Sequence, residues 1–308
     1  MVYMLGARQQ SLTSDLPLVR QKVIPTQHRL IVADSRRIDP KRIGRVDLVV
    51  TSPPYWSIID YGTKGQIGYG QELPAYITDL QKVWKICLTV LNPGCRMVVN
   101  IGDQYVRGNP GKGTMYHIKP LHAKIVNSIL DTAGIKVRYL GSIIWHKIST
   151  THTSGGASVM GSYGYPRKVY PCFENEYLAI FEKEGEAPKP SHEVRALAHI
   201  GREEWRDLTQ GLWTIPGAKA GENPAPFPES IPERFIRMFT FPGETVLDPF
   251  VGGGTTMKAA ASWGRNSVGI DIGFRTSSGH PFDKVVRQAV LSMEPRSDYV
   301  GQPSISVA

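Results

Sequence analysis

Short apolar runs alternate with amphipathic segments along most of this chain. The runs have the length of buried strands and lie at residues 29–34, 46–50, 95–101, 136–145, 177–182, 245–248 and 267–270. Apolar residues recur at helical spacing over 72–91, and shorter helices are predicted over 120–133, 231–239 and 257–263. Residues 92–94 (Asn-Pro-Gly) are expected to end the first helix. Strands that alternate with helices in this order predict an α/β fold with a mainly parallel sheet.

Three regions lack this pattern. Residues 1–27 are expected to form an irregular arm, and the Gly-rich residues 60–71 are expected to form a loop. Residues 149–225 are rich in Gly, Ser, Thr and Pro, and their polar part after 183 shows little periodicity. Because loops on a rigid scaffold often carry recognition, we interpret 149–225 as an insertion that contains one core strand near 177–182.

Residues 51–56 (Thr-Ser-Pro-Pro-Tyr-Trp) follow directly on the apolar run at 46–50, so they are expected at the carboxyl end of a strand. The two prolines stiffen the backbone and remove two donors, while their carbonyls remain acceptors. A hydroxyl, two rigid acceptors and an aromatic face suit a planar group that carries an NH2, such as the amine edge of a nucleobase. Alone, the segment is equally consistent with a Pro-rich turn.

A glycine loop lies between the predicted strand at 245–248 and the helix at 257–263. Glycines let the backbone approach a ligand, and the helix amino terminus offers free N–H groups. Asp271 ends the next strand, 19 positions after Gly252 (271 − 252), close to the spacing of an acid that binds ribose hydroxyls. The loop has neither a following Gly-Lys-Ser/Thr nor the Gly-x-Gly-x-x-Gly pattern, which disfavours phosphate and dinucleotide sites. Asp248, directly before the loop, favours a cationic ligand end, and S-adenosylmethionine combines such an end with a ribose diol.

Composition limits the class of protein. With 308 residues and 41% hydrophobic content, the chain can bury one sizeable core and a modest appendage. It contains no apolar run approaching the ~20 residues that span a membrane, and its start lacks the apolar core of a secretory signal. We therefore expect a cytoplasmic protein with no membrane partner. The three cysteines lack metal-ligand spacing, so we expect free thiols and no metal site.

Positive charge is concentrated in one part of the chain. The net charge is +9, and residues 104–173 alone carry nine Lys or Arg against one Asp, a net +8. A basic surface of this kind attracts a phosphate backbone. The candidate DNA contacts within it are Arg107, Lys112, Lys147, Arg167 and Lys168.

The two motifs together resemble those of the amino-methyltransferases that act on DNA. Residues 248–254 (Asp-Pro-Phe-Val-Gly-Gly-Gly) resemble the cofactor motif of that family, and residues 51–55 resemble its catalytic motif, Ser/Asn/Asp-Pro-Pro-Tyr/Phe. The catalytic motif comes first in the chain, as in the permuted (beta) group. The resemblance covers about residues 28–272, with few matches in the insertion at 149–225.

The resemblance implies a Rossmann-like, S-adenosylmethionine-dependent methyltransferase fold: a mixed, mainly parallel sheet with helices on both faces, plus a recognition insertion. Residues 28–148 would be the catalytic half, 149–225 the target-recognition insertion, and 226–308 the cofactor-binding half. The implied partners are double-stranded DNA and a cognate restriction endonuclease acting on the same site in a prokaryotic, nucleoid-associated setting, while the oligomeric state stays open. The implied catalytic residues are Ser52, Pro53, Pro54 and Tyr55, and the implied cofactor-binding residues are Asp34, Phe227, Asp248, Phe250, Gly252, Gly254, Thr255 and Asp271.

Serine in the first catalytic position resembles the members that methylate cytosine at its exocyclic N4, and N6 of adenine stays as the alternative. Ser52 and the Pro53 carbonyl would accept hydrogen bonds from the target amine, so that its lone pair faces the methyl donor. The base would have to be flipped out of the duplex, and Tyr55 would stack on it. Cys172, which superficially resembles the nucleophile of cytosine-C5 methyltransferases, is not needed in this chemistry.

Two other classes of protein remain open at this point. The glycine loop alone is compatible with a dinucleotide-dependent oxidoreductase, although that leaves residues 51–56 and the basic region unexplained. The basic region alone is compatible with a DNA-binding module that has an inactive core. Related Asn-Pro-Pro-Tyr enzymes methylate glutamine side chains of proteins, so RNA or protein substrates are further alternatives.

Overall fold

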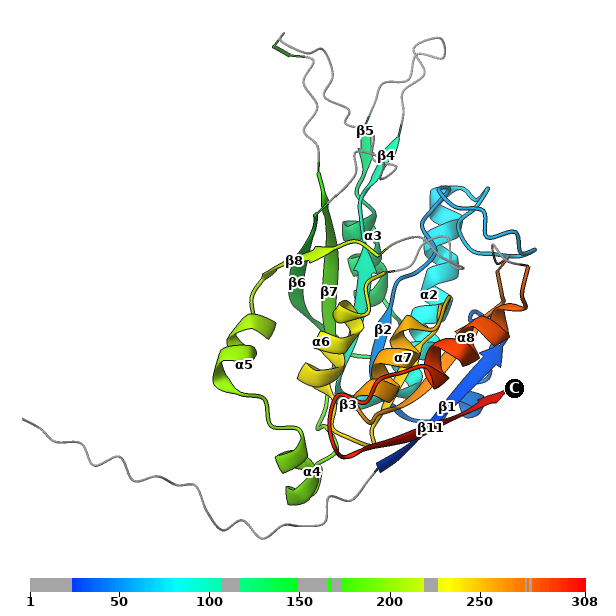
Figure 1. The fold of residues 1–308 in the computed structure, drawn as a ribbon. Helices are drawn as coiled ribbons and strands as arrows, with labels where there is room; N and C mark the ends of the chain where they lie inside the picture. Colours follow the sequence, from blue (N-terminus) through cyan, green and yellow to red (C-terminus); the bar gives the residue numbers. More distant parts are fainter. Residues whose placement is uncertain are drawn as a thin grey trace, which may run out of the picture.

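A single mixed sheet organises the molecule (Figure 1). The computed structural model describes residues 24–106, 117–148, 166–167, 173–218, 227–274, 276 and 279–308. In this part of the chain the sheet has nine strands in the order β11-β1-β10-β9-β2-β3-β7-β6-β8, and β7 alone runs antiparallel to its neighbours. The strands are β1 (Ile24–Val32), β2 (Val46–Thr51), β3 (Leu91–Ile101), β6 (Val137–Ile148), β7 (Asn175–Lys183), β8 (Leu212–Pro216), β9 (Thr245–Asp248), β10 (Asn266–Asp271) and β11 (Val300–Val307).

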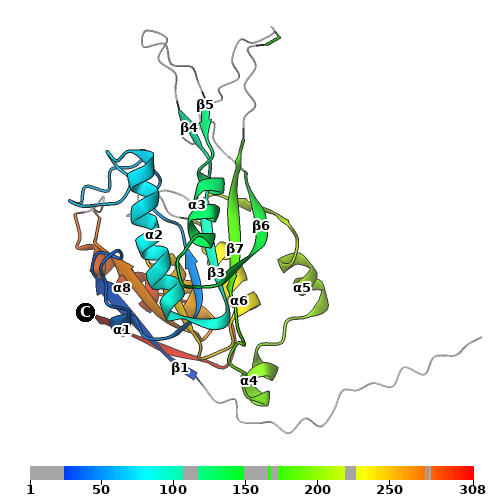
Figure 2. The ribbon, with the colours of Figure 1, turned by 180° about the vertical axis from the view of Figure 1, so that it is seen from behind.

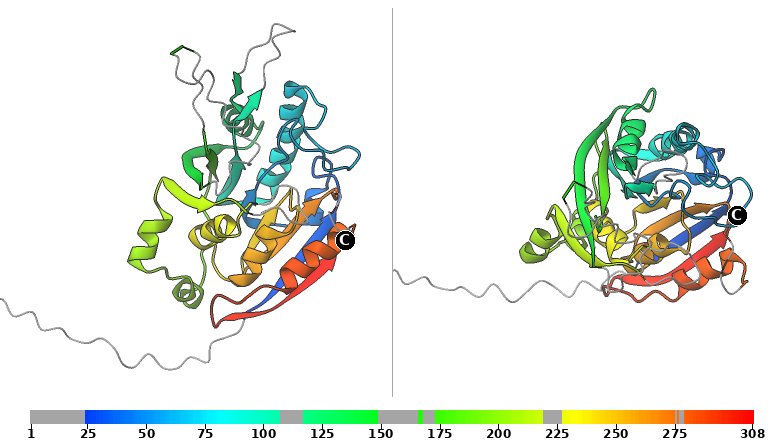
Figure 3. Two further views of the ribbon diagram at one scale, coloured as in Figure 1. Left: turned by 45° about the horizontal axis from the view of Figure 1, so that its top comes forward. Right: turned by 90° about the horizontal axis from the view of Figure 1, so that it is seen from above.

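Helices cover both faces of the sheet (Figures 2 and 3). One face carries α1 (Pro40–Ile43), α2 (Leu73–Val90) and α3 (Leu121–Leu130), and the other carries α6 (Ser230–Phe239), α7 (Thr255–Ser262) and α8 (Phe282–Leu291). The short helix α5 (Arg202–Leu208) lies on the β8 side, whereas Leu197 of α4 (His192–Leu197) packs against the cluster that includes residues of α8 and β11. The antiparallel pair β4 (Gln104–Val106) and β5 (His117–Lys119) extends beyond the end of β3. None of the helices described is both long enough and apolar enough to cross a bilayer.

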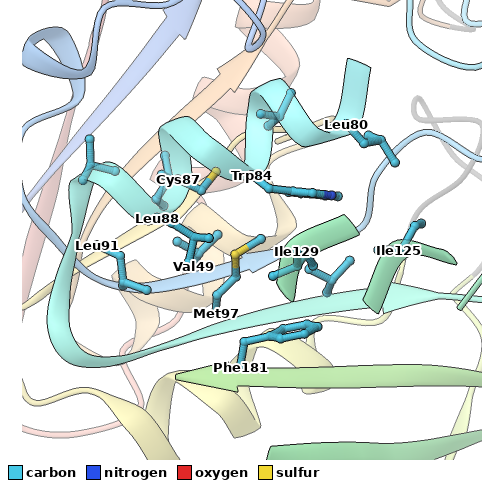
Figure 4. Close-up of a cluster of buried hydrophobic side chains, with 14 of the residues drawn as sticks. Val49, Leu80, Trp84, Cys87, Leu88, Leu91, Met97, Ile125, Ile129 and Phe181 are labelled. Carbon is cyan, nitrogen blue, oxygen red and sulfur yellow. The ribbon is translucent and has the colours of Figure 1, made fainter. Parts of the chain in front are cut away.

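The core lies in two layers, one on each side of the central strands. In β2, Val49 packs under α2, whereas Leu48 and Val50 pack under α6, and none of the three is more than 2% exposed. Because successive side chains of a strand point to opposite faces, burial on both faces makes such a strand an unbroken apolar run. Figure 4 shows the α2 layer, where Trp84 faces Met97 of β3 beside the residues of α3.

The fold class predicted from the sequence is confirmed, with differences at the element boundaries. The strand predicted at 177–182 is β7. β1 begins at Ile24, so residues 24–27 of the predicted arm belong to the sheet, and the rest of the arm lies outside the described residues. The helix ends just before residues 92–94, as predicted, since α2 stops at Val90. These residues do not form a separate loop: they lie in β3, which starts directly after α2 and pairs irregularly with the start of β2.

The polar region after 183 holds more structure than its pattern predicts. It contains α4, α5 and the edge strand β8, which pairs with β6 in parallel. The pattern is weak because α4 buries no residue and α5 buries only Leu208. The carboxyl-terminal elements α8 and β11 were also not predicted, since α8 buries only Val286 and Val290, and β11 is a largely exposed edge strand.

His28 of β1 makes folding stability pH-dependent. Its ring is 1% exposed and hydrogen-bonds Ser267 of β10 at 2.7 Å and Thr26 at 2.9 Å. Burial lowers the pKa of His28 to about 4, from 6.5 in an unfolded chain. Between these values only the unfolded state binds the proton, so about 3 kcal/mol of stability, fully present above pH 6.5, is lost as the pH falls to 4.

We expect His28→Asn to remove this loss. Asparagine keeps polar atoms for the two hydroxyl partners but does not titrate. Urea unfolding between pH 4.5 and 7.5 should therefore give a flatter dependence of the unfolding free energy on pH for the variant than for the unsubstituted chain. Parallel curves for the two proteins would contradict the assignment.

Candidate active site

A cavity opens where four adjacent parallel strands, β1, β10, β9 and β2, end at the same edge of the sheet. Carboxyl ends of parallel strands are where ligands bind in open α/β sheets. The cavity has an empty volume of about 820 Å³, including its open mouth. Eight of the twelve residues predicted for catalysis and cofactor binding line it: Asp34, Ser52, Pro54, Phe227, Phe250, Gly252, Thr255 and Asp271. Residues that lie far apart in the chain thus meet in one crevice.

Asp271 is held in the cavity wall by the backbone. Its two carboxylate oxygens accept hydrogen bonds from the Gly252 and Gly273 N–H groups at 3.0 and 2.9 Å. Burial raises the pKa of Asp271, and these backbone donors oppose the rise. Gly254 does not line the cavity: it starts α7 with φ +87°, and a Cβ there would lie 3.1 Å from Val286. The loop thus needs glycine at 254 for helix packing.

Asp248 does not face the cavity, contrary to the expectation that it meets a cationic ligand. Its side chain is 1% exposed, and its oxygens accept hydrogen bonds from Thr51 Oγ1 (2.7 Å), the Phe250 N–H (3.0 Å) and Thr256 Oγ1 (2.7 Å). Burial raises the pKa of Asp248 to about 6, although these donors favour the ionised form. The carboxylate therefore joins the end of β2 to the glycine turn, so that the two motifs hold a fixed relative position.

Asp34 lines the cavity from the end of β1 and is paired there with Arg36. The guanidinium donates to both Asp34 oxygens at 2.8–3.1 Å, to Asp79 of α2 at 2.6 Å and to the Gly65 carbonyl at 2.8 Å. Burial opposes ionisation of Asp34, but the Arg36 contacts outweigh it and hold the pKa of that carboxyl below its usual value. One arginine thus fixes Asp34 together with the loop that follows residues 51–56, the predicted catalytic segment.

The catalytic segment leaves β2 and bends over the same cavity. Pro53 is buried, and the Pro54 carbonyl accepts the Tyr76 hydroxyl of α2 at 2.8 Å. The Tyr55 phenol lies near the side chains of Glu176 and Ser52, both of which influence its pKa. Burial, followed by the nearby Glu176 charge, raises the pKa of Tyr55 well above its usual value, so the phenol stays protonated. Pro53 and Tyr55 do not line the cavity itself, whereas Ser52 does.

The loop at 57–71 supplies cavity residues that the sequence reasoning missed. Tyr61, Gln66 and Ile67 line the cavity opposite the strand ends, and Thr63 Oγ1 donates to the Gly273 carbonyl at 2.8 Å across it. The Gly-rich sequence predicted a loop but gave no signal that it folds back over the strands. Ser35, Gly65, Val251, Ile272, Gly273 and Phe274 also line the cavity, and each is adjacent or close in sequence to a predicted residue or to this loop.

Two of the five predicted DNA contacts lie within the described residues. Arg167 is exposed and has φ +72°. Lys147 of β6 pairs with Glu176, and its ammonium lies 4.6 Å from the Trp145 ring centre, so it belongs to the surroundings of the catalytic segment. The predictions for Arg107, Lys112 and Lys168, and the interpretation of Cys172, fall outside the described residues.

A mainly parallel sheet with acids and a glycine turn at its carboxyl edge defines an α/β enzyme with a nucleotide-like cofactor. The family model described as DNA methylase, for N6/N4 methyltransferases, matches residues 46–275. Type II methyltransferase M.MjaI of Methanocaldococcus jannaschii is 32% identical over 278 residues, which cover 81% of this chain and 88% of that protein. The chain belongs to the N6/N4 methyltransferase family of DNA methylases.

Solved structures show the same fold. A protein described as a DNA modification methylase from Thermus thermophilus, in complex with S-adenosyl-L-methionine, is 30% identical, with a TM-score of 0.68 over 91% of this chain and 97% of that one. The cytosine-N4-specific PvuII DNA methyltransferase, 20% identical, matches in fold, with a TM-score of 0.59 over 87% of this chain and 94% of that one. The cofactor is S-adenosyl-L-methionine, which decides against the dinucleotide-dependent oxidoreductase.

Proposed function

We propose that this chain methylates the exocyclic N4 amine of a flipped cytosine in double-stranded DNA. The observation that carries the proposal is the position of Ser52: it lines the cofactor cavity and also contacts Tyr55 of the catalytic segment. Serine at this position resembles the N4-cytosine members of the family, and N6 of adenine is the alternative target. Because M.MjaI is a type II methyltransferase, we also propose a role in restriction-modification, with a nuclease that cuts the same site.

The lining of the cavity fits S-adenosylmethionine. Asp271 offers carboxylate oxygens beside the glycine turn for the ribose hydroxyls, and Asp34, at the end of the neighbouring strand β1, would approach the adenine. Phe227 and Phe250 add apolar walls suited to a purine and the ribose. When bound, this cofactor supplies an electrophilic methyl group.

The catalytic segment would bind and orient the target amine. The amine is a weak nucleophile because its lone pair is conjugated with the ring. Acceptance of its two N–H groups by Ser52 Oγ and the Pro53 carbonyl draws the nitrogen toward tetrahedral geometry and turns its lone pair to the cavity. The Pro54 carbonyl is already engaged by Tyr76, which leaves the Pro53 carbonyl as the second acceptor of the proposal. The Tyr55 ring stacks on the base, which must leave the duplex to reach this depth.

Expression in a bacterial host that lacks its own DNA methylases tests the proposal directly. We expect mass spectrometry of nucleosides from the host DNA to detect N4-methylcytosine. Detection of N6-methyladenine in its place would establish the alternative target. Absence of both products, with S-adenosylmethionine still bound by the purified chain, would favour a DNA-binding module with an inactive core and contradict the proposed reaction.

A further inference from the structure

Glu176 is a buried acid next to the catalytic segment, and the chemistry above gives it no role. It lies near the start of β7, is 7% exposed, and sits beside the end of β3, where β7 pairs antiparallel. A Cβ at Gly102 would lie 3.0 Å from its Cγ, so glycine there leaves room for the side chain. Buried carboxylates require compensating donors, and those of Glu176 come from β3 and β6.

Two donors from neighbouring strands hold this carboxylate. Asn100 Nδ2 of β3 donates to Oε2 at 2.8 Å, and the Lys147 ammonium of β6 pairs with Oε1. The same Asn100 nitrogen lies 3.5 Å from Ser52 Oγ. The Tyr55 phenol lies near both Glu176 and Ser52, and both side chains influence its pKa. Glu176 is therefore linked to Ser52 through Asn100, with the Tyr55 phenol beside both.

The direction of these hydrogen bonds follows from the charge. An ionised carboxylate only accepts, so a phenol proton beside it would point to Glu176, and the phenol oxygen would then be available to accept the Ser52 proton. The Asn100 amide must present its NH2 to Glu176, and the same nitrogen then faces Ser52 Oγ as a donor. With its own proton turned to Tyr55, the Ser52 oxygen keeps lone pairs for an incoming amine. Lys147 balances the buried negative charge that imposes this arrangement.

We infer that Glu176 is a positioning residue for methyl transfer: through Tyr55 and Asn100 it fixes Ser52 as a hydrogen-bond acceptor for the target amine. The inference rests on the proposed function and deepens it. Its position beside the Tyr55 phenol would also restrain the ring that stacks on the base. The same group thereby sets both contacts of the catalytic segment with the target.

Glu182 provides a matched control on the same strand. It is 8% exposed and also lies among cations, pairing with Arg96 at 2.8 Å and with Arg138. Neither of these two partners belongs to the catalytic segment or the cavity lining. The rate of Glu182→Gln thus shows the effect of neutralising a buried acid in β7. Any further loss of rate in Glu176→Gln measures the effect on Ser52.

The experiment compares both variants with the unsubstituted full chain, using tritiated S-adenosylmethionine and saturating genomic DNA from a methylation-deficient host. We expect Glu176→Gln to lower the single-turnover rate about 10- to 100-fold, with the cofactor Kd changed less than about twofold by calorimetry. Glu182→Gln should keep the rate within about threefold, whatever its effect on Tm. An unchanged rate in Glu176→Gln, or an equal loss in both variants, overturns the inference.

A double-substitution cycle separates positioning from a structural role. If Glu176 acts through Ser52, Glu176→Gln should lower the single-turnover rate less than about threefold in a chain that already carries Ser52→Ala. If the effect of Glu176→Gln is structural and independent of Ser52, the rate losses of the two substitutions should multiply. If Glu176→Gln alone does not fold, Glu176→Gln with Lys147→Gln leaves no unpaired charge and tests the same rate. An unsubstituted chain that methylates no DNA refutes the proposed function itself. If the unsubstituted chain is active but the rate losses of Glu176→Gln and Ser52→Ala multiply, only the positioning role of Glu176 is refuted.

Discussion

Replacing Ser52 by alanine is expected to lower the rate of methyl transfer by about 100-fold or more, while the Kd for S-adenosylmethionine changes less than about twofold. The hydroxyl is one of the two acceptors proposed for the target amine, and alanine provides no substitute. Ser52 lies where the cofactor cavity meets Tyr55, and the acids and glycine turn proposed to hold the cofactor are unaffected. Single-turnover kinetics and calorimetry on the same preparation measure the two quantities.

Ser57→Ala is the control for this substitution. Ser57 lies five positions on, exposed at the start of the loop at 57–71, and does not line the cavity. Its replacement should leave the transfer rate within about twofold. Full activity in Ser52→Ala would remove the basis of the proposed mechanism. A large loss in Ser57→Ala would show instead that the whole loop responds to any change.

Replacing Asp271 by asparagine is expected to raise the cofactor Kd about 10- to 100-fold, the effect of one or two charge-assisted hydrogen bonds. Both carboxylate oxygens accept from backbone N–H groups, those of Gly252 and Gly273. A backbone donor cannot reverse its direction, so the new NH2 group must face another donor and disturb the glycine turn. Calorimetric titration with S-adenosylmethionine measures the change.

Asp248→Asn is the informative comparison, because the two acids have the same chemistry but different partners. Two of the three donors to Asp248 are the hydroxyls of Thr51 and Thr256, which can rotate to accept from an amide. The substitution also removes a buried charge. We expect the Kd to stay within about threefold, the scale of one weakened neutral hydrogen bond. A loss of affinity equal to that of Asp271→Asn would restore the sequence-based expectation that Asp248 contacts the ligand.

The catalytic segment and glycine loop could be found in the sequence because their functions require particular residue types in consecutive positions. Only glycine suits φ +87° at position 254, and only two prolines stiffen residues 53–54 in this way. The central strands were equally visible, because burial on both faces of the sheet makes each an apolar run. The short helices α4 and α5 were missed because they bury at most one residue each, so hydrophobic periodicity carries little information there. Strand β8 buries Trp213 and Ile215 in alternation, but with five residues it is too short for a clear pattern.

The sequence by itself determined the class of fold, the two motifs and the methyl donor, since each depends on local residue chemistry. The tertiary structure alone decided which acids face the ligand. Asp248 ends the strand before the glycine loop, and Asp271 ends the strand after it. Asp248 is buried and accepts hydrogen bonds from Thr51 and Thr256, whereas Asp271 lines the cavity. It also brought Glu176, 124 positions after Ser52 (176 − 52), beside the catalytic segment. Contacts between residues so far apart in the chain depend on sheet order and strand register, which no local pattern of residues specifies.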